Sequence, residues 1–90
     1  MKYKLLLSKS VSKFILLRNK KEQRIIKTKF NFLIEDPFHH PQLDIKSLKG
    51  EHELYRLRIG KYRFIYEVKK NELIIIMFTA GSRGDIYKEV

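Results

Sequence analysis

The chain has 90 residues, 43% of them hydrophobic and 12% aromatic, which suits one small globular domain over residues 1–90 and excludes a disordered chain. Its 20 lysines and arginines against 10 acids give a net charge of +10, which predicts a polyanionic partner, most often nucleic acid, with a membrane surface as the weaker alternative. Cysteine is absent, which excludes thiolate sites, and the N-terminal leucine run is too short for a signal peptide or membrane span, so we expect a soluble cytosolic protein.

Residues 2–18 predict a strand followed by a short helix. Tyr3, Leu5 and Leu7 occupy alternate positions, so residues 2–8 fit a strand that carries these side chains on one face. Ser10 is a candidate N-cap for the helix. The apolar positions of that helix are Val11, Phe14, Ile15 and Leu17.

Residues 19–36 predict a second helix, which completes a helical hairpin. Asn19 is a candidate N-cap, and Glu22 stands three residues later in the position of a capping box. Pro37 ends the helix by residue 35 or 36, because the residue before a proline avoids the helical region. One helix face carries the apolar side chains Ile26, Phe30 and Leu33.

The predicted hairpin is the most basic part of the chain. Up to Ile34 there is one acid, Glu22, and there are ten basic residues: Lys2, Lys4, Lys9, Lys13, Arg18, Lys20, Lys21, Arg24, Lys27 and Lys29. A solvated helix face explains the polarity of such a run, but it does not explain the single sign of the charge. The pattern favours a phosphate-binding surface.

Residues 35–44 predict a loop, because the stretch contains two prolines. His39 and His40 are adjacent in this loop, and His52 stands alone further on. Without a third ligand at a useful spacing, these residues favour surface histidines over a metal site. We therefore expect neither a metal nor another cofactor.

Tyr55–Val68 alternates strictly and predicts a β-hairpin around Gly60-Lys61. Glycine at the first loop position suits a type II′ turn. The pairing places Ile59 across from Tyr62, Leu57 across from Phe64 and Arg58 across from Arg63. The apolar face predicts core positions for Tyr55, Tyr62, Phe64 and Tyr66.

This register gathers Arg56, Arg58 and Arg63 on one small area of the sheet. Like charges directly opposite one another destabilise a sheet, so the cluster indicates a bound anion about as readily as three solvated side chains. Glu67 is predicted on the same face, either as a base or as a charge partner for an arginine.

The last predicted strand covers residues 73–80, where the sequence LIIIMFTA places apolar side chains on both faces of the strand. We expect a central strand covered on both faces, with a register against the hairpin that the sequence does not fix. The order of a strand, two helices and three or four strands predicts an α+β fold. A helical hairpin packs on one face of a small twisted, mainly antiparallel sheet.

The available side chains suit cleavage of RNA through its 2′-hydroxyl. The sequence has no glycine-rich phosphate loop, no Ser-His-Asp set and no carboxylate pair in a polar context, but it has clustered arginines and a C-terminal tyrosine, Tyr87. This reaction needs a group that accepts the 2′-hydroxyl proton, cations that stabilise the phosphorane and an acid for the 5′-oxygen. It needs neither a metal nor water.

Three segments together resemble the RelE toxins of the RelE/ParE superfamily: Leu48-Lys49-Gly50, YRLRIGKYRFIYEV at 55–68 and GSRGDIYK at 81–88. The first half of the chain agrees in layout alone. The resemblance implies the toxin of a type II toxin–antitoxin system, a metal-independent endoribonuclease that cuts mRNA in the ribosomal A site. It also implies a cognate antitoxin protein as partner, besides the ribosome and mRNA.

The resemblance implies individual roles as well. The family's catalytic positions match Arg63, Arg83 and Tyr87, and its RNA-binding positions match Lys49, Arg56 and Arg58. Tyr87 would accept the 2′-hydroxyl proton, while Arg63 and Arg83 would stabilise the phosphorane. The family often has lysine where Arg56 and Arg58 stand, and arginine grips phosphate in a fork but does not readily release a proton. The spacing from Arg83 to Tyr87 also varies within the family.

Two other functions remain open. A ParE-type toxin would share the fold and bind gyrase without cutting RNA, but the presence of both Arg83 and Tyr87 argues against it. A non-enzymatic RNA-binding module would need only the positive charge.

Overall fold

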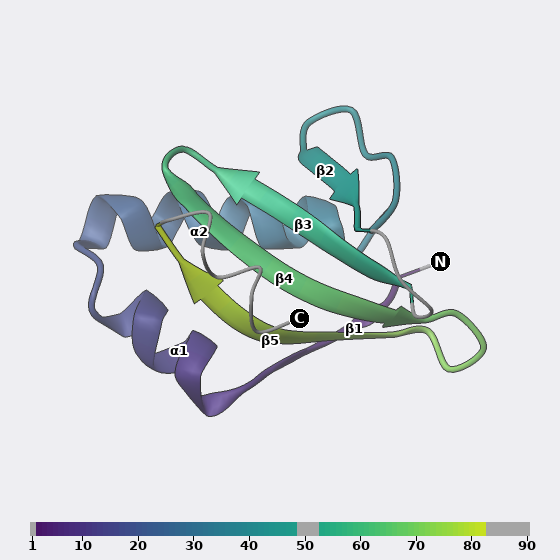
Figure 1. Cartoon of the computed structure of the whole chain (residues 1–90). Helices are drawn as coiled ribbons and strands as arrows, with labels where there is room; N and C mark the ends of the chain where they lie inside the picture. Colours follow the sequence, from purple (N-terminus) through teal and green to yellow (C-terminus); the bar gives the residue numbers. More distant parts are fainter. Residues whose placement is uncertain (1, 49–52, 83–90) are drawn as a thin grey trace.

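The computed structural model describes residues 2–48 and 53–82. Its elements follow in the order β1 (Lys4–Leu7), α1 (Lys9–Leu16), α2 (Lys20–Leu33), β2 (Asp44–Ser47), β3 (Leu54–Ile59), β4 (Tyr62–Lys69) and β5 (Ile74–Gly81). Figure 1 shows a twisted sheet with α2 running behind it and α1 beside β1 and β5. The predicted α+β fold is confirmed. Within the described residues, no helix is long and apolar enough to cross a membrane.

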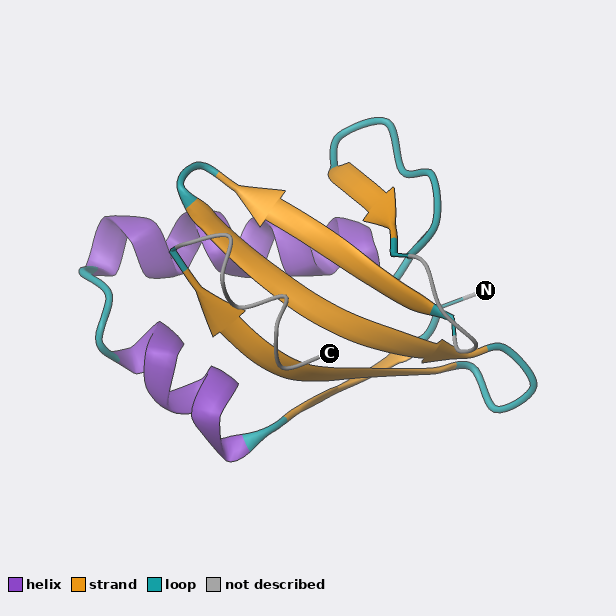
Figure 2. Cartoon of the chain, in the orientation of Figure 1, coloured by secondary structure: helices purple, strands orange, loops and turns teal. Residues whose placement is uncertain are grey.

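The five strands form one sheet in the order β1-β5-β4-β3-β2 (Figure 2). The β1–β5 pairing is parallel, and the other three described pairings are antiparallel, as predicted for a mainly antiparallel sheet. Parallel pairing of β1 with β5 is possible because the whole helical hairpin and three strands separate them along the chain.

The first helix begins two residues earlier than predicted, because its N-cap is Ser8 and not Ser10. Ser8 still belongs to the sheet through its amide, which donates to the Met77 carbonyl oxygen at 2.9 Å. Its backbone is extended, and its hydroxyl oxygen accepts from the Val11 amide at 3.2 Å. One residue thus ends β1 and caps α1, which places Ser10 inside the first helical turn.

The second helix begins as predicted. Asn19 is extended, and its side-chain oxygen Oδ1 accepts from the Glu22 amide at 2.8 Å. The Glu22 carboxylate, however, accepts from the Tyr62 hydroxyl at 2.8 Å and so ties the start of α2 to the turn between β3 and β4. The last helical residue is Leu33, slightly before the predicted end.

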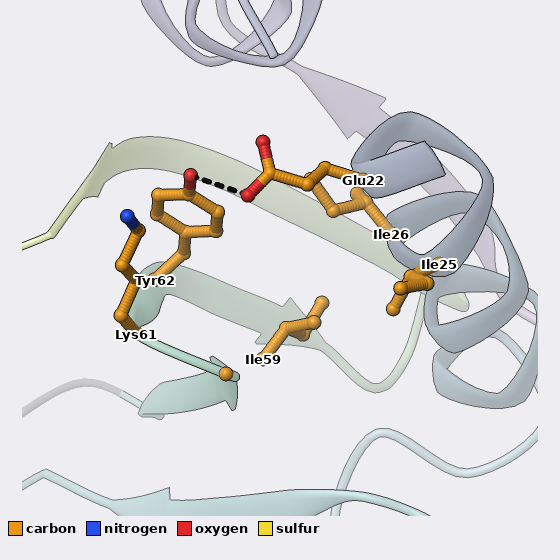
Figure 3. A pocket seen from close by; sticks show the side chains of 7 residues that line it. Glu22, Ile25, Ile26, Ile59, Lys61 and Tyr62 are labelled. Carbon is orange, nitrogen blue, oxygen red and sulfur yellow. Dashed lines mark hydrogen bonds between the residues drawn. The ribbon is translucent and has the colours of Figure 1, made fainter. Parts of the chain in front are cut away.

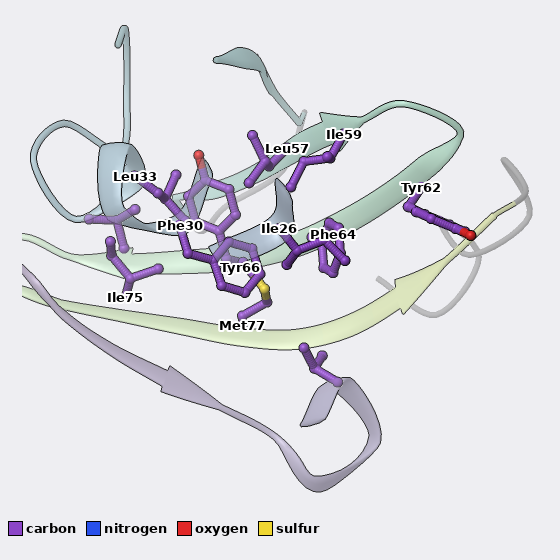
Figure 4. Close-up of a cluster of buried hydrophobic side chains, with 12 residues drawn as sticks. Ile26, Phe30, Leu33, Leu57, Ile59, Tyr62, Phe64, Tyr66, Ile75 and Met77 are labelled. Carbon is purple, nitrogen blue, oxygen red and sulfur yellow. The ribbon is translucent and has the colours of Figure 1, made fainter. Parts of the chain in front are cut away.

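The core lies between the helices and one face of the sheet (Figure 4). The predicted face of α2 is buried, together with Val11 of α1, against side chains of β3, β4 and β5. Phe30 meets Phe64 edge-to-face with ring centres 5.3 Å apart, a favoured aromatic geometry. Burying one large apolar side chain stabilises the fold by roughly 1.5–3 kcal/mol. The buried sheet residues are Leu57, Ile59, Tyr62, Phe64, Tyr66, Val68, Ile75 and Met77.

The predicted register of the β3–β4 hairpin is confirmed. Ile59 pairs with Tyr62, Leu57 with Phe64 and Arg58 with Arg63. Gly60 has φ of +59°, whereas Lys61 does not have a positive φ, as a type II′ turn requires. Tyr55 is half-buried, with its ring stacked on Tyr66 at 5.6 Å, so the predicted apolar face is complete.

Two features of the sheet differ from the prediction. Residue 44, expected at the end of a loop, begins the edge strand β2. Strand β5 starts at Ile74, and its register shifts opposite Ile65/Tyr66. The core face of β5 is buried, but the opposite face, with Ile74, Ile76 and Phe78, is only half-buried. The expectation of complete cover on both faces was therefore wrong for the second face.

Candidate functional site

The predicted arginine cluster lies on the sheet face away from the helices. Arg58 and Arg63 form a cross-strand pair, and Arg56 stands two residues along β3 on the same face. Lys46 of β2 pairs with Arg56 and adds a fourth cation. We call this surface of β2, β3 and β4 the arginine face; it carries Lys46, Arg56, Arg58 and Arg63.

Asp44, at the start of β2, holds two of these arginines. One carboxylate oxygen accepts from Arg56 Nη2 at 2.5 Å, and the other accepts from Arg58 Nε at 3.0 Å. Both contacts form at the sheet edge, because Asp44 pairs with Arg58 in the β2–β3 register. A single exposed carboxylate thus fixes two guanidinium groups and offsets one of their two charges.

Arg56 is the more buried of the two, with 12% of its side chain exposed. Its Nε is fully buried and has no hydrogen-bond partner within residues 2–48 and 53–82. A guanidinium held in this way has lost conformational freedom, so an incoming acceptor meets a preorganised donor.

Arg63 differs from its neighbours. It is half-buried and, across the part of the chain that the structure describes, forms no ion pair with an acid. Glu67 lies on the same face of β4 but pairs across to Leu54 and Ile76, not to an arginine. The charge of Arg63 therefore adds to that of Arg58 directly opposite.

Four residues of the sequence hypothesis lie outside the described residues: Lys49, His52, Arg83 and Tyr87. The structure brings together Arg56, Arg58 and Arg63 of the proposed site and leaves the positions of the others open.

Of the two loop histidines, His39 is exposed and His40 is half-buried. The His40 ring stacks on Phe32 at 4.8 Å, and its Nε2 lies 3.3 Å from Glu35 Oε1. Among the described residues, no group of three or more potential ligands is placed to hold a metal ion.

The basic surface of the helical hairpin is mostly exposed, but Arg18 has a structural role. Its guanidinium carbon lies 4.4 Å from the centre of the Phe14 ring, and Nη1 donates to the Tyr62 hydroxyl at 3.4 Å. The Arg18–Tyr62 and Glu22–Tyr62 hydrogen bonds together connect the turn between the helices with the end of the β3–β4 hairpin.

Asp44 and Lys46 belong to the arginine face and were not anticipated from the sequence. The sequence signal for this strand is a short alternation, in which the apolar residues Leu43 and Ile45 alternate with the charged residues Asp44 and Lys46. A stretch of only four residues near two prolines fits an edge strand as well as a loop, so its pattern alone does not distinguish the two structures.

Comparison with known proteins identifies relatives over nearly the whole chain. Residues 8–87 match the family described as "ParE toxin of type II toxin-antitoxin system, parDE". RelE1 of Methanocaldococcus jannaschii is 44% identical over 64 residues, which cover 67% of this chain and 71% of that protein.

Two of the similar solved structures match this chain along nearly their full length. The archaeal RelE-RelB complex of Pyrococcus horikoshii OT3 contains a chain 29% identical, with a TM-score of 0.82 over 93% of this chain and 98% of that one. The RelB-RelE antitoxin-toxin complex of Methanococcus jannaschii gives 28% identity and a TM-score of 0.71, over 93% and 96%.

Proposed function

The chain belongs to the RelE-type toxins of type II toxin–antitoxin systems, and on this premise we propose that it is a ribosome-dependent endoribonuclease that cleaves mRNA in the A site. The 2′-oxygen attacks the adjacent phosphorus while the bond from phosphorus to the 5′-oxygen breaks, which leaves a 2′,3′-cyclic phosphate on one product and a 5′-hydroxyl on the other. The observation that carries the proposal is the direct pairing of Arg58 with Arg63 on an outward sheet face.

This pairing costs the apo protein stability, since two cations face each other across neighbouring strands. An anion between them reverses the sign of that interaction. A phosphate group presents several oxygens, and a guanidinium binds two of them in a planar fork. Asp44 already holds Arg56 and Arg58 in place, so these two are suited to grip flanking phosphates.

Arg63 is suited to a different role. Because it has no acidic partner among the described residues, its full charge is available where negative charge develops on the phosphorane. Arg83 shares this task in the proposal, Tyr87 accepts the 2′-hydroxyl proton, and Lys49 contacts RNA; these three roles rest on the sequence resemblance.

The proposal includes a protein partner. The related chains of Pyrococcus horikoshii and Methanococcus jannaschii were solved as complexes of RelE with RelB. We propose that this chain likewise binds an antitoxin, and that the antitoxin is acidic because the toxin carries a net charge of +10.

The test is mRNA cleavage on programmed ribosomes by the wild type and three variants. Arg63→Ala removes the proposed charge stabilisation, and Tyr87→Phe removes only the hydroxyl. General acid–base groups contribute about 10²–10⁴ in rate, so Tyr87→Phe should cut slower by that factor, and Arg63→Ala should lose at least as much.

Lys69→Ala is the matched control, because Lys69 is an exposed cation on the same face of β4 at the other end of the strand. It should cleave at the wild-type rate. Thermal melts of all variants check folding, and ribosome pelleting checks binding. Wild-type cleavage by both Arg63→Ala and Tyr87→Phe would place the reaction elsewhere. Growth arrest by the wild type without any new mRNA 5′ ends would favour a ParE-type toxin.

A further inference from the structure

Among the described residues, Asp44 is the one acid whose carboxylate forms ion pairs with the arginine face. Glu67 lies on the same face but forms no ion pair within that part of the chain. Glu22 belongs to the helix side of the sheet, where its carboxylate accepts from the Tyr62 hydroxyl beside a hollow (Figure 3). No second acid of the described residues therefore duplicates the contacts of Asp44.

The register of β2 explains how one carboxylate reaches two arginines. Asp44 lies directly across from Arg58, and Arg56 is its diagonal neighbour, two residues away along β3. Diagonal neighbours on adjacent strands remain within reach of long side chains. Oδ1 of Asp44 accepts from Arg56 Nη2, and Oδ2 accepts from Arg58 Nε. Each carboxylate oxygen thus fixes the orientation of one guanidinium group.

These contacts also determine which edge of Arg58 is left for a ligand. A guanidinium binds a phosphate through two neighbouring N–H groups, either Nε with one Nη or the two Nη groups together. Asp44 occupies Nε of Arg58, whereas Nη1 and Nη2 have no hydrogen-bond partner among the described residues. Because 49% of its side chain is exposed, Arg58 can offer the edge formed by Nη1 and Nη2 to an incoming phosphate.

Stability does not account for this arrangement. Exposed ion pairs contribute little to stability, and the Asp44 side chain is 46% exposed. The buried Nε of Arg56, without a partner in residues 2–48 and 53–82, is a cost to the fold. A carboxylate at this place also repels the phosphates of RNA. What it provides is fixed geometry, since side chains that are already ordered lose less conformational freedom when a ligand binds.

We infer that Asp44 is a positioning residue for RNA cleavage, which acts by fixing the guanidinium groups of Arg56 and Arg58 for the flanking phosphates. This inference rests on the proposed function and deepens it. Its predicted effect is opposite in sign to that of charge alone. Removal of Asp44 makes the net charge of +10 one unit more positive, which by itself favours RNA. Loss of positioning should instead slow the reaction.

The experiment measures mRNA cleavage on programmed ribosomes over a range of toxin concentrations, which separates the rate at saturation from the half-saturating concentration. A misplacement of about 1 Å can cost about 10²-fold in rate, so Asp44→Ala should lower the saturated rate by about ten- to a hundredfold. Asp44→Asn keeps the shape and one acceptor oxygen and should lose less. Thermal melts check folding, and Asp44→Asn serves for the comparison if Asp44→Ala does not fold.

Glu72→Ala is the matched control, because it removes the same charge as Asp44→Ala. Glu72 is exposed, forms no ion pair in the described part of the chain and follows β4 at the end away from Arg63. It should cleave at the wild-type rate or slightly faster. A loss in Glu72→Ala equal to that in Asp44→Ala would show an effect of charge alone and would overturn the positioning role.

A double-mutant cycle separates positioning from a general structural effect. If Asp44 acts through Arg58, then Asp44→Ala should cost less in the Arg58→Ala background than in the wild type, because coupled residues are not additive. A wild-type saturated rate for Asp44→Ala, or losses that simply multiply in the double variant, would overturn the positioning role and leave the proposed function standing. A wild-type protein that does not cleave mRNA on programmed ribosomes would overturn both.

Discussion

Tyr66 is a buried phenol at the centre of the sheet, and its hydroxyl donates to the Pro37 carbonyl oxygen at 2.7 Å. The bond joins β4 to the loop after α2 and satisfies a polar group in the core. Burial raises the pKa of the Tyr66 hydroxyl well above its usual range, because an ionised phenolate would lose its hydration there.

The raised pKa of Tyr66 predicts how stability depends on pH. The folded chain holds the phenolic proton more tightly than the unfolded chain, in which tyrosine ionises near 10.0. This stabilising contribution is complete below that pH and is lost as pH rises above it. Urea unfolding should therefore show a falling free energy of unfolding above pH 10 that is shallower in Tyr66→Phe.

At neutral pH, Tyr66→Phe should also lower the free energy of unfolding by roughly 1–3 kcal/mol, since it leaves the Pro37 carbonyl oxygen without its buried donor. Tyr55→Phe is the control, because the Tyr55 side chain is only half-buried and has no hydrogen bond through its hydroxyl within the described residues. A steep alkaline loss of equal size in the wild type and Tyr66→Phe would contradict the assignment.

Among the elements, α1 shows how one residue serves two structures. Ser8 ends β1, caps α1 and donates through its hydroxyl to the Phe78 carbonyl oxygen at 3.2 Å. Ser10, two residues later, makes only a 3.4 Å contact with the same carbonyl oxygen and a 3.1 Å contact with the Ser8 hydroxyl.

The two serines therefore give a matched test of where α1 begins. Loss of an N-cap side chain costs about 0.5–2 kcal/mol, so Ser8→Ala should lower the free energy of unfolding by that amount. Ser10→Ala should change it by a few tenths of a kcal/mol, and alanine's higher helix propensity offsets part of that loss. Chemical denaturation of both variants is the measurement, and a larger loss for Ser10→Ala would place the cap where the sequence pattern alone suggested.

The elements also show what a sequence can specify. Strict alternation across Gly60-Lys61 determined the β3–β4 register, because a slip of one residue would expose Phe64 and bury arginines. In β5 the side chains on both faces are apolar, so a slip of one residue would not bury charged groups and the sequence does not select a register. The register shift opposite Ile65/Tyr66 therefore had no sequence signal. Likewise, the arginine cluster was predictable from alternation, whereas Asp44 reaches it only through the pairing of β2 with β3.

Over the whole molecule, the two faces of the sheet carry different kinds of side chain. The helices cover one side, and the other side presents the arginine face. With a net charge of +10, both surfaces attract polyanions, so overall charge determines the rate of encounter while local geometry determines which partner is held.

This division predicts a specific salt dependence for RNA binding. Each phosphate that a cation neutralises releases counterions, so the logarithm of the affinity falls linearly with the logarithm of the salt concentration, with a slope of about 0.7 per contact for single strands.

Titration of a fluorescent single-stranded RNA at several salt concentrations should give a steep slope for the wild type. Arg63→Ala should reduce the slope by about one contact. Lys69→Ala also lowers the net charge by one but leaves the arginine face intact, so it should shift the affinity without changing the slope. A flat response of the wild type to salt, or equal slopes for the wild type and Arg63→Ala, would show that the arginine face does not contact phosphate.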